Sequence, residues 1–96
     1  MREYSINLGH GDALVVIFEG DGDKTSATLG HHVQGRLIAM YVGFAYRNPT
    51  DDRDDKVGKA VALYHATCSV SWIVELLLLD PELSGYYLSG LRSLEH

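Results

Sequence analysis

The stretch KTSATLGHHVQGRLIAMYVGFAYR (residues 24–47) is the longest segment of this chain with one consistent hydrophobic period. Its larger apolar side chains recur three and four residues apart, which predicts one face of an α-helix; they are Leu29, Val33, Leu37, Met40, Tyr41 and Phe44. A second stripe of small residues, Gly35, Ala39 and Gly43, is spaced at i, i+4 and i+8. Because glycine destabilises a helix interior, this stripe predicts a close contact with another backbone.

Two shorter segments before this stretch predict strands: residues 4–8 alternate between apolar and polar, and residues 13–19 are apolar enough to be covered on both faces. Residues 4–8 and 13–19 flank the turn Gly9-His10-Gly11-Asp12, and the two segments most simply pair as a hairpin. The sequence therefore predicts an α+β fold, in which an N-terminal antiparallel β-hairpin packs against two long helices plus a short C-terminal helical segment.

The second helix is expected to begin after Pro49, with Thr50 as its N-cap. Its predicted buried stripe is Val57, Val61, Tyr64 and Cys68, while Ala60, Ala62 and Ala66 offer small surfaces that can receive the glycine stripe. For residues 69–79 we favour a helix broken near Ser69, with a strand over residues 70–74 as the alternative. Asp80-Pro81 then predicts the cap and first turn of a short last helix.

Length and composition bound the class of protein. Residues 1–93 are expected to form one globular domain, and Leu94-Glu95-His96 resembles the remnant of an expression tag. Eight basic and thirteen acidic residues give a net charge of −5, which argues against direct nucleic-acid binding. A single cysteine excludes an internal disulfide and no segment has the length of a membrane helix, so we expect a cytoplasmic protein without membrane contact.

Four side chains suggest a metal or ligand site as an alternative. His65 and Cys68 are three residues apart, and His31 or His32 from the preceding segment could join them. No spaced Cys/His ladder supports zinc, and Cys68 lies in the middle of a predicted helix rather than at a helix start that would activate it. We therefore predict a non-catalytic protein with no metal and no cofactor.

The acidic run Asp51, Asp52, Asp54 and Asp55 has two interpretations. The carboxylates complement the positive end of a helix, or they form an acidic knob for a basic, nucleic-acid-binding surface of a protein partner. Tyr86 and Tyr87 are candidate aromatic anchors of the same interface. We predict a small acidic protein-binding domain, such as a phage or mobile-element inhibitor of a host defence complex (anti-CRISPR-like). A homo-oligomeric structural or regulatory module, for example a homodimer, is the alternative.

Overall fold

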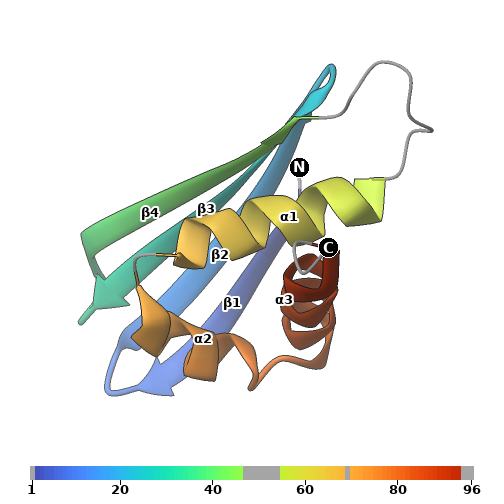
Figure 1. Cartoon of the computed structure of the whole chain (residues 1–96). Coiled ribbons are helices and arrows are strands. Elements are labelled where there is room, and N and C mark those ends of the chain that lie inside the picture. Colours follow the sequence, from blue (N-terminus) through green and yellow to red (C-terminus); the bar gives the residue numbers. More distant parts are fainter. Residues whose placement is uncertain (1, 47–54, 69, 94–96) are drawn as a thin grey trace.

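The computed structural model describes residues 2–46, 55–68 and 70–93 (Figure 1). Four strands come first and three helices follow. The strands are β1 (Arg2–Gly9), β2 (Asp12–Asp21), β3 (Lys24–Val33) and β4 (Arg36–Tyr46). The helices are α1 (Asp55–Thr67), α2 (Ser71–Leu77) and α3 (Pro81–Ser93).

The strands form one antiparallel sheet in the order β1-β2-β3-β4, so each strand pairs with its neighbour in sequence. The turn between β3 and β4 consists of Gln34 and Gly35, whose φ angles are 51° and 79°. Two consecutive residues with positive φ are typical of the two-residue turns that match the twist of a β-hairpin. Gly35 is therefore a turn residue, and its amide donates a hydrogen bond to the carbonyl of Gly11 in the β1–β2 turn at 3.1 Å.

The prediction of a helix over residues 24–47 is wrong, because this stretch is the β3–β4 hairpin. Its apolar residues also alternate, so that Met40, Val42 and Phe44 lie on one face of β4, and alternation is the period of a strand. The segment is rich in β-branched and aromatic residues, and β3 gains backbone partners on both sides, from β2 and from β4. The expected helical stripe of Gly35, Ala39 and Gly43 consequently does not exist as a helix face.

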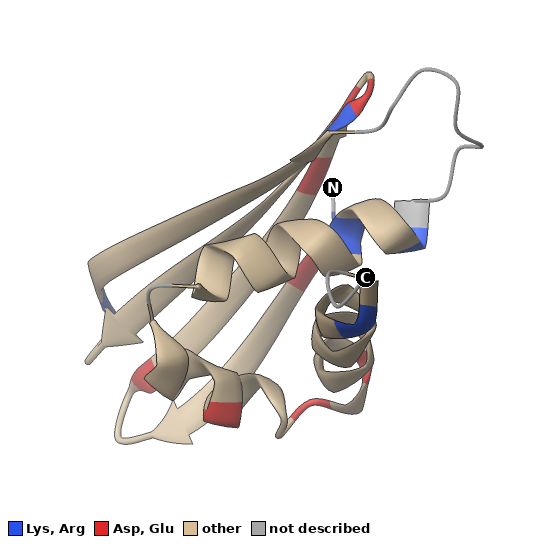
Figure 2. Ribbon diagram, in the orientation of Figure 1, with Lys and Arg blue, Asp and Glu red and all other residues tan. Residues whose placement is uncertain are grey.

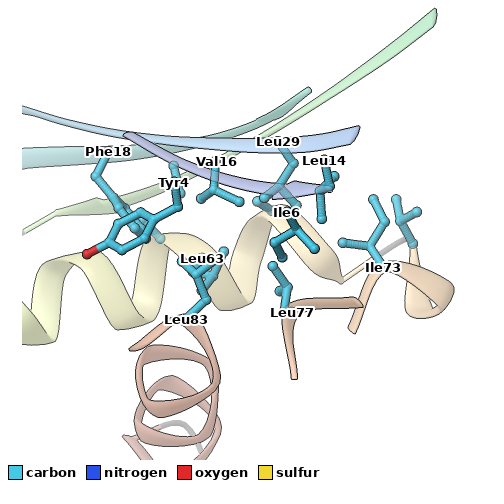
Figure 3. Packing of buried hydrophobic residues seen from close by; sticks show 14 of the residues in the cluster. Tyr4, Ile6, Leu14, Val16, Phe18, Leu29, Leu63, Ile73, Leu77 and Leu83 are labelled. Carbon is cyan, nitrogen blue, oxygen red and sulfur yellow. The ribbon is translucent and has the colours of Figure 1, made fainter. Parts of the chain in front are cut away.

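The helices pack on one face of the sheet and enclose the core (Figure 3). The largest fully buried side chains come from both layers: Leu14, Val16, Phe18 and Leu29 from the sheet, and Leu63, Ile73, Leu77 and Leu83 from the helices. The predicted α+β class and the N-terminal hairpin are confirmed. The finer expectation of two long helices and a two-stranded hairpin needs correction: the sheet has four strands, and α1, α2 and α3 have 13, 7 and 13 residues.

Helix α1 buries Leu63 and small residues, while only Val61 and Tyr64 of its predicted stripe are partly buried. Ala60, Ala62 and Ala66 are almost fully buried, whereas Val57 and Cys68 are exposed. The small side chains of these alanines let α1 approach the sheet closely at Gly43. A Cβ atom at Gly43 would overlap the carbonyl oxygen of Ala62 and the amide nitrogen of Ala66. Gly43 thus does lie against another backbone, but as a strand residue under a helix.

The C-terminal part follows the sequence more closely. Residues 71–77 are helical, so the strand alternative for this segment is excluded, and the chain leaves the helical conformation between α1 and α2. The Asp80 carboxylate accepts hydrogen bonds from the amides of Glu82 and Leu83 at 2.9 and 3.1 Å, which confirms the predicted cap of α3. None of the helices in the described ranges is long and apolar enough to cross a membrane.

Candidate functional site

The face of the sheet opposite the helices carries a row of large apolar side chains on β4. Gly43 and Ala45 are buried beneath α1, so the residues between and beside them point the other way. We call this row the β4 patch: Leu37, Met40, Val42, Phe44 and Tyr46, which are between 40% and 74% exposed. No helix in the described part of the chain covers this face.

A register shift explains why Leu37, rather than Ile38, belongs to the patch. His31 pairs with Ala39 and His32 pairs with Leu37, so Ile38 is an extra residue in β4. The Leu37 side chain lies over Gly30, with its Cδ1 atom 3.3 Å from the position that a Cβ of Gly30 would take. Gly30 is the register partner of Met40, which places Leu37 and Met40 on the same face.

The neighbouring strand presents small residues beside the β4 patch. Ser26 and Thr28 of β3 pair with Phe44 and Val42, and Gly30 pairs with Met40. We call Ser26, Thr28 and Gly30 the β3 strip. The open face therefore consists of a ridge of large side chains on β4 next to a low strip on β3.

The β4 patch contains no charged residue, and the charged residues lie at the margins of the open face. Figure 2 shows charged residues at the β2–β3 turn and at the start of β4, with uncharged residues along the rest of β4. Glu3 on β1 and Glu19 on β2 share the face of Ile17 and Val15, on the side away from β4. Lys24 lies at one end of the patch, with its Nζ atom 4.8 Å from the centroid of the Phe44 ring.

Helix α1 also touches the backbone of the edge strand β4. The Nδ1 atom of His65 lies 2.7 Å from the carbonyl oxygen of Phe44. Because a carbonyl oxygen only accepts hydrogen bonds, Nδ1 carries the proton in this contact. His65 thereby fixes α1 against β4 and is directed at the strand rather than at a metal site.

The other residues considered for a metal or ligand site, His31, His32 and Cys68, have separate surroundings. His31 packs against Trp72 of α2 with ring centroids 5.1 Å apart, and Cys68 is exposed after the end of α1. His32 is on the opposite face of the hairpin from His31, beside Leu37. Among the described residues no group of three or more His, Cys, Asp or Glu side chains is arranged to hold a metal ion.

Of the residues predicted to bind a partner, the described part of the chain includes Asp55, Tyr86 and Tyr87. Asp51, Asp52 and Asp54 lie outside the described residues, and Asp55 is the first residue of α1. Tyr86 and Tyr87 make aromatic contacts within the fold: Tyr86 lies 5.5 Å from the Phe18 ring, and Tyr87 stacks on Tyr64 at 6.1 Å. The structure thus gives both tyrosines a packing role.

A separate polar cluster lies where β1 meets α3. Arg2 forms an ion pair with Glu82 at 3.3 Å, and its guanidinium lies 5.3 Å from the centroid of the Tyr4 ring. The Tyr4 hydroxyl is buried and has no hydrogen-bond partner among the described residues. Burial, assisted by the nearby Glu82 carboxylate, raises the pKa of Tyr4 well above its ordinary value.

Sequence reasoning missed the β4 patch because it assigned Met40 and Phe44 to a helical stripe. The signal was present in the alternation of Val42, Phe44 and Tyr46 with the smaller residues Gly43 and Ala45. Comparisons with protein-family models, with curated proteins and with solved structures find no match to this chain.

Proposed function

We propose that this protein is a non-catalytic protein-interaction domain that binds its partner through the β4 patch. The observation that carries the proposal is the exposure of five large apolar side chains in one uncharged row. Apolar surface of this extent is at the upper end of what monomers expose, and such patches often mark a site of protein or membrane interaction.

The composition of the patch favours a protein partner. Phe44, Tyr46 and Met40 belong to the residue types enriched at protein interfaces, and no charged residue interrupts the row. Lys24 and Arg36 flank the row, but the net charge of −5 opposes attraction of the chain to anionic lipids. The ridge contains no nucleophile and no acid–base pair, which supports a binding role.

Site-specific photo-crosslinking tests the proposal. A photoreactive amino acid at position 42, in the middle of the patch, is expected to form a covalent adduct with a protein in the cells that naturally produce this chain. The matched control is position 75, because Glu75 is also exposed but lies on α2. Equal adduct formation at both positions, or none at position 42, would reject the patch as the interface.

The identity of the adduct also tests the narrower proposal that the partner belongs to a host defence complex. If the acidic run Asp51–Asp55 helps to dock that partner, its replacement by asparagine should slow association, and the effect should shrink as salt is raised. Unchanged association at low salt would restrict the acidic run to a role at the start of α1.

A further inference from the structure

We propose that the occupant of the β4 patch is a second copy of this chain, packed sheet on sheet about a two-fold axis. The inference rests on the proposed function, because it names the partner at the same surface. It is carried by the area of the patch, by the shape of the open face and by the distribution of charge on it.

The area agrees with that of a stable dimer. Five side chains that are about half exposed present roughly 600 Å² of surface, and two copies would bury roughly 1,200 Å² before other residues are counted. Partly exposed Thr28 of β3, which lies within the overlap, adds to the contact. The total therefore reaches the range of about 1,200–2,000 Å² that specific interfaces bury.

The shape of the open face is complementary to itself. A two-fold axis parallel to the strands and midway between β3 and β4 places β3 of each copy over β4 of the other. Thr28 of one copy then faces Val42 of the second, and Ser26 faces Phe44, because these residues share register positions. In the middle of the open face, the large side chains of Met40, Val42 and Phe44 thus meet the β3 strip of the other copy, and the strands stay aligned as in a β-sandwich.

The same axis keeps the acidic residues of the open face apart. Glu3 and Glu19 are on β1 and β2, so they remain outside the overlap of the two β3–β4 halves. An axis perpendicular to the strands would stack β1 on β1 and bring Glu3 of both copies together, which is unfavourable. With the parallel axis, Lys24 of one copy lies over Tyr46 of the other, where a cation can contact the ring face.

Packing on the face explains the patch better than addition of a strand at the edge of β4. Side chains of the patch project from the face of the sheet, so a strand added beside β4 would leave them in water. Such an edge dimer would join two apolar patches into a larger exposed one, which favours further association instead of a closed pair.

Light scattering after size-exclusion chromatography tests the inference on the purified full chain. We expect twice the chain mass at about 100 µM protein, and at least about a 100-fold weaker dimer for Val42→Asp, since two uncompensated charges would enter the interface. Leu79→Asp is the matched control, because Leu79 is exposed to a similar or greater degree outside the sheet and its substitution should leave the dimer intact.

A second variant separates a shaped interface from nonspecific apolar association. Thr28→Phe adds apolar surface to the open face but fills the β3 strip, so it should weaken the dimer at least about 10-fold. Nonspecific association would strengthen in this variant, and that result would overturn the inference. Circular dichroism of each variant verifies that the fold is retained, and Thr28→Phe provides the test if Val42→Asp does not fold.

The two proposals fail in different ways. A single-chain mass for the parent protein at about 100 µM overturns the second copy as the occupant. If photo-crosslinking at position 42 then still yields an adduct with a different protein, the patch remains an interaction surface. Absence of any adduct, with the chain or with another protein, rejects both proposals.

Discussion

Gly43 shows how one missing side chain determines the distance between two layers. It lies in β4 where α1 crosses the sheet, and the backbone of α1 occupies the space that a Cβ atom would need. The obstacle consists of backbone atoms of Ala62 and Ala66, so no side-chain rotation can relieve the overlap. The helix or the strand would have to move as a whole.

Gly43→Ala is therefore expected to lower the free energy of unfolding by at least about 2 kcal/mol through overpacking. For a domain of this size, each kcal/mol lowers Tm by about 4–8 °C, so the loss is measurable in a thermal melt. Gly20→Ala is the matched control on β2, because nothing lies within 4 Å of its Cβ position. Equal melting temperatures for the two variants would contradict the close approach of α1.

Tyr4 supplies a pH-dependent prediction. Its pKa is raised in the folded protein, chiefly by burial, so the unfolded chain loses the phenolic proton first as pH increases. The stabilisation by neutral Tyr4 is fully present below pH of about 10 and is lost progressively above it. We expect Tyr4→Phe to flatten the decline of unfolding free energy in alkaline solution.

Near neutral pH the same substitution should stabilise the protein by about 1–3 kcal/mol, because it removes a buried hydroxyl that has no hydrogen-bond partner among the described residues. Urea denaturation of both proteins between pH 7 and pH 11 provides the measurement. If the free energy of unfolding declined equally in parent and variant as pH rises, groups other than Tyr4 would be its cause.

At the scale of elements, α3 contains two glycines with opposite surroundings. Gly90 is buried against α1, and a Cβ there would overlap the carbonyl oxygen of Ala60. Gly85 is in the same helix, but nothing lies within 4 Å of its Cβ position. Substitution of each glycine therefore separates the effect of packing between α3 and α1 from the effect of intrinsic helix propensity.

We expect Gly85→Ala to stabilise the protein by up to about 1 kcal/mol, since alanine is the better helix former. Gly90→Ala gains the same helix propensity but forces α3 away from α1, so a net destabilisation of about 1–3 kcal/mol is expected. Chemical denaturation of the two variants gives both values. Stabilisation by both substitutions would mean that α1 and α3 do not pack in contact at Gly90.

On the scale of the whole molecule, the described helices cover one face of the sheet and leave the β4 patch exposed on the other. If folded copies pair through this patch, association stabilises the folded state by mass action. A tenfold increase in protein concentration should then raise Tm by about 2–5 °C. Val42→Asp should melt at a temperature independent of concentration, and a parent Tm that does not change would contradict pairing.

The sequence by itself determined the elements whose signals are local. The β1–β2 hairpin follows from an alternating segment and an apolar segment on the two sides of a glycine-containing turn, and the start of α3 follows from Asp80 as a cap before Pro81. The helical conformation of residues 71–77 also agreed with the sequence. In each case the deciding interaction joins residues close together in the chain, so the pattern contains the information.

Only the tertiary structure decided the conformation of residues 24–46 and the face that remains open. Leu29, Met40 and Phe44 fit a helical spacing and an alternating one, and the choice depends on backbone hydrogen bonds that β3 makes with β2, residues outside the segment. The position of α1 then decides which side chains of β4 are exposed, because Gly43 admits the helix on one face and leaves Val42 on the other. A helix satisfies its backbone locally, whereas a strand requires partners that no local pattern specifies.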